Sequence, residues 1–377
     1  MNIPFHKPYI SPRALEYIKD VIERGKLSGD GPVGHEVEAE LKRRYGIRHL
    51  LLTTSCTHAM EIGMMLLDLK PDDEVILPSF TFVSTANAIL RAGGKPVFCE
   101  IDDSTCTIDV SDLERRVSKK TRAIVPVHYA GVAAEMDGIL EIARPRHILV
   151  AEDAAQGVNA KYKGKFLGTI GDLGAFSFHD TKNFVMGEGG AFITNDENLA
   201  RRAEVVREKG TNRANFLRGE VDKYTWVDVG SSYVQSDVLA AILKSQLEMI
   251  DEIQEKRRQI HEWYIEGLAD LAKREQLRLP VIPSWCESNY HIFYILLRSE
   301  RERNAMLKYL KEAGIGSTFH YVSLHSSPFA QRVLGLKGLR LPVTERVSGT
   351  LLRLPIYPQL GKTEIDYVVG HVHNFFK

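Results

Sequence analysis

The chain has 377 residues, 44% of them hydrophobic and 26% charged, and its 49 Lys and Arg residues are balanced by 49 Asp and Glu residues. This length favours two domains with an ample hydrophobic core. A formal net charge of zero gives no support for a nucleic acid or a membrane surface as partner. No apolar run approaches the length of a membrane span, and the first residues lack a signal-peptide pattern. We therefore expect a cytoplasmic globular protein.

The cysteines are scattered along the chain, with no CxxC pair and no neighbouring His cluster: Cys56, Cys99, Cys106 and Cys286. This pattern indicates reduced side chains, and neither a disulfide framework nor a zinc site is expected. The prediction is that the protein holds no metal.

Short apolar runs alternate with amphipathic stretches between residues 46 and 208. The apolar runs predict strands at 49–53, 74–77, 96–100, 123–127, 148–151, 174–178 and 190–194. Helices are expected between the first five of these, at 57–69, 84–91, 112–117 and 136–143. Continuous apolar runs bounded by helices are typical of strands buried on both faces. The pattern predicts an α/β fold with a mostly parallel, doubly wound sheet of seven strands.

The character of the chain changes after residue 229, where a long helical tract follows at about 236–268 with apolar residues at regular helical spacing. A smaller α+β unit comes next, with a strand at 291–297 and helices at 303–313 and 363–375. We expect a large domain over residues 1–240, with an N-terminal arm, and a C-terminal domain over residues 241–377.

The first candidate site segment lies where the first strand gives way to a helix, at residues 54–59. A helix N-terminus offers unpaired N–H groups and the positive end of its dipole, which suits a phosphate. Thr57 adds a hydroxyl there. Ser and Thr are also common as plain N-caps. This segment alone is therefore compatible with a phosphate site or with helix capping only.

The second segment is Glu152-Asp153-Ala154-Ala155-Gln156, directly after the strand at 148–151. Ligands of open α/β sheets bind at the carboxyl ends of parallel strands. An ionised Asp153 there suits the protonated ring nitrogen of pyridoxal phosphate, and Gln156 suits its phenolic oxygen. The alternatives for Asp153 are an N-cap or a magnesium ligand.

The third segment ends a strand and continues into a polar turn that contains Lys182, five residues after Ser177. A lysine that attacks an aldehyde must lie in an enclosed site where its amine can lose its proton. A lone lysine after a strand is usually a solvated surface residue, so the argument for Lys182 depends on its neighbours.

The fourth segment follows the strand at 74–77 and contains Phe82. Phe82 is a candidate to stack on a planar cofactor. The alternative is that it is an ordinary core residue.

Three runs resemble the DegT/DnrJ/EryC1/StrS family of sugar-nucleotide aminotransferases, and the similarity covers the whole chain: 81–88 (TFVSTANA), 125–133 (VPVHYAGVA) and 207–213 (REKGTNR). The resemblance implies a fold-type I pyridoxal-phosphate transferase, of the aspartate aminotransferase type, that forms a homodimer with shared active sites. It implies Lys182 as the Schiff-base lysine, Asp153 at the ring nitrogen and Gln156 at the phenolic oxygen. It also implies Phe82 on the ring, with Cys56, Thr57 and Ser177 around the phosphate.

One segment departs from the pattern of many family members, which carry Asn-Tyr-Arg before the long helix. Here the segment reads Ser231-Ser232-Tyr233-Val234, so Ser232 is the candidate for the phosphate contact with the neighbouring subunit. Candidates for the substrate are Lys26, Lys209, Arg213, His320 and His325, of which the three cations suit a diphosphate. The alternative for each histidine is a loop residue that is hydrogen-bonded within the protein. The alternative for each of the three cations is a solvated surface residue.

The resemblance implies that L-glutamate gives its nitrogen to the cofactor, which passes it to a 4-keto-6-deoxyhexose joined to dTDP. Residues 231–233 and 128–133 favour the members that form dTDP-4-amino-4,6-dideoxygalactose, a precursor of surface polysaccharides such as lipopolysaccharide O-antigen. The gluco epimer and a 3-amino sugar remain alternatives.

A nicotinamide oxidoreductase is the rival class, because residues 29–34 (GDGPVG) fit G-x-G-x-x-G. That fingerprint requires a preceding strand, whereas a helical stretch precedes it here. We therefore expect no dinucleotide site.

Overall fold

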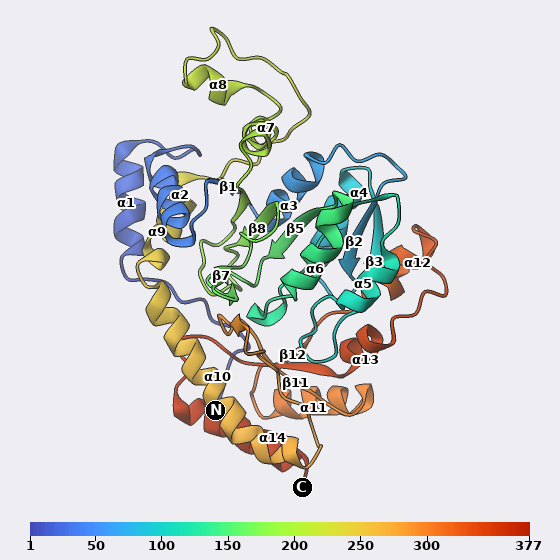
Figure 1. The fold of residues 1–377 in the computed structure, drawn as a ribbon. Helices are drawn as coiled ribbons and strands as arrows, with labels where there is room; N and C mark the ends of the chain where they lie inside the picture. Colours follow the sequence, from blue (N-terminus) through green and yellow to red (C-terminus); the bar gives the residue numbers. More distant parts are fainter.

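The computed structural model describes residues 1–377, and its centre is a seven-stranded sheet in the order β1-β9-β8-β5-β4-β2-β3 (Figure 1). Only β9 runs antiparallel to its neighbours. The mostly parallel sheet predicted from the apolar runs is confirmed. Its strands are β1 (His49–Thr53), β2 (Glu74–Pro78), β3 (Lys95–Cys99), β4 (Thr121–Ile124), β5 (Leu149–Ala154), β8 (Leu173–Ser177) and β9 (Gly190–Thr194).

Helices cover both faces of this sheet because its strands send apolar side chains alternately to either side. Ile76 and Ile124 pack in one core with α2 (Pro32–Tyr45), α5 (Val110–Arg116), α6 (Met136–Ala143) and α9 (Asp237–Leu247). Val75 and Ala123 pack in the other core with α3 (Cys56–Met65), α4 (Val83–Arg91) and α7 (Glu197–Arg207). Together these elements form the large unit.

A small unit lies below the sheet in Figure 1, and both chain termini lie beside it. Its antiparallel sheet has the order β11-β13-β12, and Ile3 near the N-terminus forms a bridge to Ile315. No helix of the structure is both long and apolar enough to cross a bilayer. The elements of this unit are α10 (Ile250–Lys273), β11 (Phe293–Leu296), α11 (Glu300–Glu312), β12 (Thr318–Phe319), α13 (Pro342–Thr350), β13 (Leu351–Leu354) and α14 (Lys362–Phe375). The short helix α12 (Pro328–Arg332) lies beside β3 of the large sheet (Figure 1).

The two units are linked through the long helical tract that the sequence predicts at about 236–268. The predicted helical tract is two helices, α9 and α10, separated at Glu248 and Met249. Leu243 and Ile253 pack in the core of the large unit, whereas Ile260 packs in the core of the small unit. The chain therefore passes from one unit to the other within α10, where the helical apolar pattern continues without a break.

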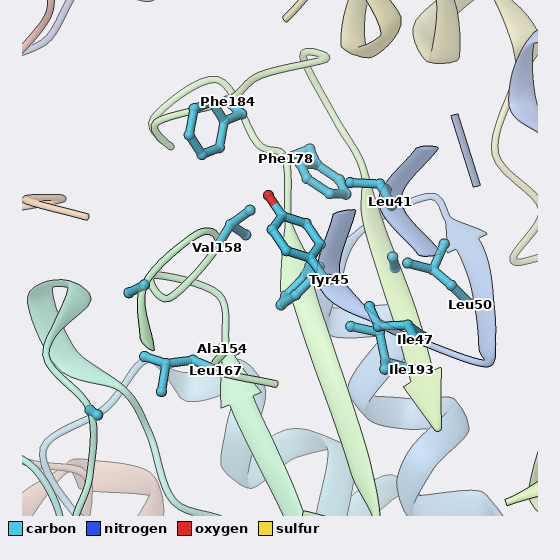
Figure 2. Packing of buried hydrophobic residues seen from close by; sticks show 14 of the residues in the cluster. Leu41, Tyr45, Ile47, Leu50, Ala154, Val158, Leu167, Phe178, Phe184 and Ile193 are labelled. Atoms are coloured by element: carbon cyan, nitrogen blue, oxygen red, sulfur yellow. The ribbon is translucent and has the colours of Figure 1, made fainter. Parts of the chain in front are cut away.

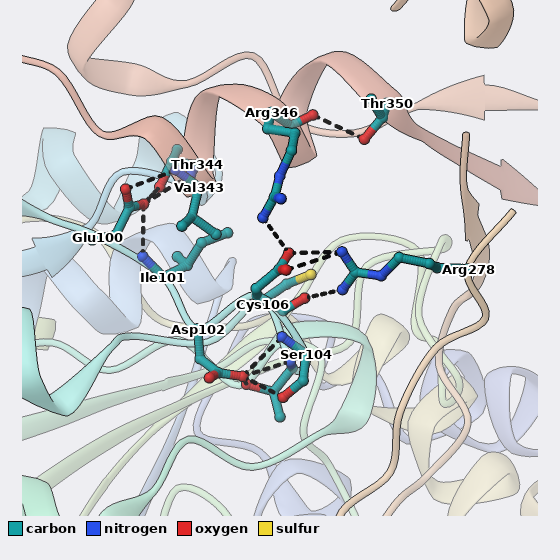
Figure 3. Close-up of polar contacts among 12 residues, drawn as sticks. Glu100, Ile101, Asp102, Ser104, Cys106, Arg278, Val343, Thr344, Arg346 and Thr350 are labelled. Atoms are coloured by element: carbon teal, nitrogen blue, oxygen red, sulfur yellow. Dashed lines mark hydrogen bonds and ion pairs between the residues drawn. The ribbon is translucent and has the colours of Figure 1, made fainter. Parts of the chain in front are cut away.

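A loop of the large unit joins the small unit through buried and exposed polar contacts (Figure 3). Glu100 accepts hydrogen bonds from the backbone N–H groups of Val343 and Thr344 at the start of α13, at 2.9 and 2.8 Å. Asp103 pairs with Arg278 at 3.0 Å and with Arg346 at 2.7 Å. These contacts fix α13, and with it β13, against the large unit.

The glycine-rich stretch before α2 binds a carboxylate of the protein itself. Asp237 is 1% exposed and accepts hydrogen bonds from the N–H groups of Val33 and Gly34 at 3.2 and 2.9 Å. A Cβ atom on Gly31 would lie 2.1 Å from the Asp237 carboxylate. The anion position at this helix N-terminus is thus occupied by the Asp237 carboxylate.

Replacing Asp237 by alanine should lower the free energy of unfolding by about 2 kcal/mol, because two buried N–H groups lose their acceptor. Urea unfolding measures this. The exposed Asp222, for which no side-chain partner is found, is the matched control, and Asp222→Ala should change stability by less than about 0.5 kcal/mol. Equal stability of both variants would contradict the capping role of Asp237.

Candidate functional site

A cavity of about 510 Å³ lies at the carboxyl ends of the parallel strands, between the large and small units. The large unit contributes one wall and the small unit the other, and the N-terminal segment adds Phe5 and His6. The lining residues used below are Cys56, Thr57, Phe82, Thr85, Asp153, Gln156, Ser177 and Lys182 from the large unit, and Arg257, His291, His320, Tyr321 and Arg353 from the rest of the chain.

Asp153 is the buried carboxylate of this cavity. The sequence places it just after a strand, but β5 extends through Ala154, and Asp153 pairs with Ala175 of β8. Its carboxylate accepts a hydrogen bond from the Thr85 hydroxyl at 2.8 Å and from the Ala155 N–H at 3.1 Å. Because β5 is regular here, the position and direction of this charge are set by the sheet.

The neighbouring Glu152 points to the opposite side of β5, as strand geometry requires. It is fully buried and accepts hydrogen bonds from Gly168, Ile170 and Gly171 N–H groups, at 2.8, 2.6 and 2.6 Å. His128 adds a contact of 2.8 Å through Nε2. A carboxylate with this many donors is well compensated, so Glu152 stabilises the end of β5 beneath Asp153.

Lys182 lies in the turn after β8, and two buried aromatic rings flank it in sequence. Phe178 and Phe184 pack in the main core around Tyr45 (Figure 2). Within the turn, the N–H of Lys182 donates to the His179 carbonyl at 2.9 Å, and that of Asp180 donates to Gly187 at 2.9 Å. The hydrophobic core therefore holds the backbone of the turn while the lysine side chain enters the cavity.

The amine of Lys182 makes no ion pair. Burial lowers the pKa of this amine, whereas Cys56 and Asp153 act in the opposite direction. A depressed pKa increases the fraction of neutral amine at a given pH, which is the form that attacks a carbonyl group.

Two hydrogen bonds orient the side-chain amide of Gln156. Its oxygen accepts the Ala130 N–H at 2.7 Å, and its nitrogen donates to the Tyr321 hydroxyl at 2.9 Å. The oxygen is therefore held by the backbone, and the amide nitrogen remains the donor that faces the cavity.

A close backbone approach brings together the two segments expected at a phosphate. Ser177 of β8 pairs with Gly190 of β9, and a Cβ on Gly190 would lie 2.4 Å from the Cys56 nitrogen. Only glycine permits this approach of β9 to the start of α3. Ser55 is the N-cap of α3, accepting the His58 N–H at 3.1 Å, so the plain capping reading fits Ser55, while Cys56 and Thr57 line the cavity.

Two predicted aromatic residues also face the cavity. Phe82 is the residue before α4, and its ring is 56% exposed. His320 lies beside Tyr129, with its Nδ1 3.1 Å from the tyrosine hydroxyl. Burial strongly lowers the pKa of His320, aided by Arg353 and Lys182, so its imidazole is neutral at physiological pH.

The remaining candidates lie outside the cavity lining. His325 is a correction to the sequence prediction, because Ser79 and Glu345 lie 2.7 and 3.3 Å from its two ring nitrogens. Lys26 donates to Ser28, and Ser232 is exposed. The last two, Lys209 and Arg213, pair with Glu208 at 3.0 and 3.6 Å.

Sequence reasoning missed the arginines of the cavity. Arg257 interrupts the buried stripe of α10 between Ile253 and Ile260, and Arg353 interrupts the apolar strand β13. The sequence did carry a signal for both arginines. Each is a charged residue at a position where the helical or strand period requires an apolar one. Thr85, Tyr321, Phe5 and His6 carried no comparable signal.

Comparisons with known proteins identify the family. Residues 8–373 match the DegT/DnrJ/EryC1/StrS aminotransferase family. The spore coat polysaccharide biosynthesis protein SpsC of Bacillus subtilis is 33% identical over 100% of this chain and 97% of its own. The uncharacterized protein MJ1066 of Methanocaldococcus jannaschii is 33% identical over 98% of this chain and 96% of its own.

Solved structures agree over the same length. The aminotransferase TlmJ from Streptoalloteichus hindustanus superposes with a TM-score of 0.90 at 30% identity, covering 99% of this chain and 98% of that one. The putative sugar aminotransferase Spr1654 from Streptococcus pneumoniae, solved in apo, PMP and PLP forms, superposes with a TM-score of 0.92 at 25% identity, covering 100% of this chain and 98% of that one.

The site fits the cofactor of such enzymes, because it combines a buried carboxylate, an unpaired lysine and a cavity of adequate size. The chain belongs to the DegT/DnrJ/EryC1/StrS aminotransferase family, with the fold-type I architecture and pyridoxal phosphate as its cofactor.

Proposed function

We propose that the protein transfers the amino group of L-glutamate to a keto sugar joined to dTDP, and that Lys182 is its catalytic residue. The observation that carries this proposal is the unpaired Lys182 amine in one cavity with the buried carboxylate of Asp153. The net reaction converts glutamate and the keto sugar into 2-oxoglutarate and the amino sugar, with no external oxidant or reductant.

The cofactor supplies an electron sink that stabilises negative charge on the substrate carbon. In our proposal Asp153 would hold the proton on its ring nitrogen, and the Gln156 amide nitrogen would donate to its phenolic oxygen. Phe82 would pack against the ring. The hydroxyls of Thr57 and Ser177 and the helix N-terminus at Cys56 would bind the phosphate. Burial raises the pKa of the Cys56 thiol, so this residue stays neutral beside the phosphate.

Lys182 would act as the base that takes the proton from the substrate carbon and carries it on its Nζ atom. This role requires a neutral amine. Burial favours the neutral form, and the core packing of Phe178 and Phe184 holds the turn.

The sugar acceptor is supported by relatives over the full chain length. SpsC acts in spore coat polysaccharide biosynthesis by its name, and Spr1654 and CalS13 from Micromonospora echinospora are described as sugar aminotransferases. His320, neutral beside Tyr129 in the cavity wall, is our candidate to bind a sugar hydroxyl.

For the product we propose dTDP-4-amino-4,6-dideoxygalactose, a precursor of a surface polysaccharide. The support is the resemblance of residues 231–233 and 128–133 to the family members that form this product. The run at 128–133 lies beside the cavity, where the Ala130 N–H donates to Gln156 and the Tyr129 hydroxyl lies beside His320. The gluco epimer and amination at carbon 3 are the alternatives, since facial choice and regiochemistry depend on how the pocket orients the sugar.

Incubation with glutamate and dTDP-4-keto-6-deoxyglucose, followed by NMR of the product, tests the acceptor and the stereochemistry together. An axial amine at carbon 4 should give small couplings between the protons on carbons 3, 4 and 5. Large couplings at carbon 4, or an amine on carbon 3, would reject the galacto product while leaving the aminotransferase assignment intact.

We further propose a homodimer that is joined in part by the segment Thr211 to Gly230. This segment, with α8 (Arg213–Leu217), projects from the top of the large unit in Figure 1. It exposes apolar side chains that a soluble monomer would not be expected to cluster: Phe216, Leu217, Tyr224, Trp226, Val227 and Val229. Ser232 follows this segment, consistent with a contact to the neighbouring active site.

Sedimentation velocity tests the dimer. Trp226 is 76% exposed, and Trp226→Ser should raise the dimer dissociation constant by about 10-fold or more, since interface aromatics commonly contribute over 1 kcal/mol. Lys223→Ser, an exposed neighbour, is the control and should leave it unchanged. A fully active wild-type monomer would reject the proposal.

Asp153→Asn should slow both half-reactions by at least about 100-fold, because a neutral partner no longer holds the ring proton. Thr85→Val, which removes one hydrogen bond to Asp153, should slow them by about 10-fold. Stopped-flow absorbance of the bound cofactor measures each half-reaction. Wild-type rates in Asp153→Asn would show that another group protonates the ring.

A further inference from the structure

His291 brings a buried imidazole to the wall of the catalytic cavity. It lies just before β11, is 5% exposed, and lines both the catalytic cavity and a second, much smaller cavity. Its Nδ1 lies 2.9 Å from the side-chain oxygen of Asn183. The amide nitrogen of Asn183 donates to the Asn289 carbonyl at 2.8 Å, so the amide oxygen faces His291. Nδ1 of His291 is therefore the donor of this hydrogen bond.

This hydrogen bond fixes the tautomer of His291. With the proton on Nδ1, Nε2 carries a lone pair and can only accept a hydrogen bond, yet Nε2 forms none within the protein. The buried His128 differs, because Glu152 lies 2.8 Å from its Nε2 and the Ala134 N–H donates to its Nδ1 at 3.1 Å. Buried polar groups are rarely left without a partner. The free acceptor of His291 therefore indicates a donor that approaches it inside the cavity.

The smaller cavity places Lys182 next to His291. Its volume is about 10 Å³, roughly that of a single water site, so the residues that line it are close neighbours. Lys182, Asn183 and His291 are all among them. Burial lowers the pKa of His291 well below its usual value, and Lys182 acts in the same direction. The imidazole is therefore neutral at physiological pH, with its lone pair available to the lysine.

Lys182 is the donor that needs such an acceptor. When it acts as a base, its amine becomes an ammonium group with three N–H donors. An enclosed ammonium group is unfavourable unless these donors are satisfied, and Arg257 and Arg353 add positive charge to the same cavity. In the proposed function Asp153 would be engaged by the ring nitrogen of the cofactor. The lone pair of His291 supplies an acceptor that remains free.

We propose that Nε2 of His291 accepts a hydrogen bond from Nζ of Lys182 when this amine carries the proton, which makes His291 a positioning residue for the base. The proton stays on Nζ and the imidazole stays neutral, so no group is oxidised or reduced. Asn183 binds the ring and directly follows Lys182 in the chain, which keeps acceptor and amine together. The inference rests on the proposed function, since it needs Lys182 as the base.

The pKa of Lys182 tests the contact directly. In the PMP form of the enzyme this amine is free, and competitive acetylation with acetic anhydride over a range of pH, read by mass spectrometry, measures its pKa. A hydrogen bond to the charged form raises a pKa. His291→Leu should therefore lower the pKa of Lys182 by about one unit, a 10-fold change in the protonation equilibrium. His291→Gln, which retains an acceptor, should restore part of this loss.

The matched control is His261→Leu. His261 is also buried, at 6% exposed, but packs against Tyr290 and Phe293 outside both cavities. This variant should leave the pKa of Lys182 unchanged, and an equal shift in both variants would contradict a direct contact. The other groups that act on the pair stay the same in all variants: Cys56, Asp153, Arg257, His320 and Arg353.

Kinetics separate this role from substrate binding. The ammonium group forms only after the substrate has bound, so His291→Leu should slow the maximal rate of both half-reactions by about 10-fold while the half-saturating concentration of L-glutamate stays within about twofold. Stopped-flow absorbance of the bound cofactor measures both quantities. A higher half-saturating concentration of glutamate or of the sugar at a normal maximal rate would assign His291 to that substrate instead.

Histidine NMR with ¹⁵N keeps the proposal testable if His291→Leu fails to fold. In the PMP form of the wild type, Nε2 of His291 should be unprotonated, and Lys182→Met should move its resonance downfield because the donor is lost. A protonated Nε2, or a resonance that does not move, would overturn the contact. If borohydride labels a lysine other than Lys182, the proposed function fails, whereas a lowered pKa of Lys182 in His291→Leu would still support the hydrogen bond.

Discussion

The buried side-chain amide of Asn289 is the contact on which the geometry of the cavity most depends. Asn289 is 1% exposed, and its amide nitrogen donates to the carbonyls of Gln156 and Val158 at 2.9 and 2.8 Å. Its amide oxygen accepts the His291 N–H at 3.1 Å, and no side chain at Gly131 would fit beside it. One residue from outside the sheet thus fixes the loop after β5 that carries Gln156 and directly follows Asp153. Without it, two buried carbonyls would lose their donors, at about 1–3 kcal/mol each.

The same segment also reaches the turn of Lys182. The side chain of Asn183 donates to the Asn289 carbonyl at 2.8 Å and accepts from His291 Nδ1 at 2.9 Å. Asp153 lies on β5 and Lys182 in the turn after β8, and residues 289–291 hold the segments that directly follow both of them. His6 adds a further contact, donating to the Asp180 carbonyl at 2.7 Å. Asp153 and Lys182 are therefore positioned jointly by the sheet, the core beneath the turn and the chain that crosses from the small unit.

What the sequence could predict follows from this arrangement. The sheet, and a carboxylate at the strand end near Asp153, could be predicted because the apolar period and the strand ends are local patterns, whereas Lys182 was indicated by the family resemblance. The second wall was not, since Arg353, Tyr321 and Phe5 meet the cavity only through the docking of separate elements. His320 and His325 look alike in sequence, but Ser79 and Glu345 retain His325 outside the cavity. The sequence does not resolve where one unit passes into the other, because α10 carries one continuous helical pattern across both cores.

The central claim is that Lys182 carries the cofactor in the site of Asp153. Borohydride reduction of the purified enzyme fixes the cofactor to its lysine, and peptide mapping by mass spectrometry then identifies the residue. The account predicts modification of Lys182 alone and no modified peptide after Lys182→Ala. Stoichiometric modification of another lysine, or retention of the reducible adduct in Lys182→Ala, would contradict it.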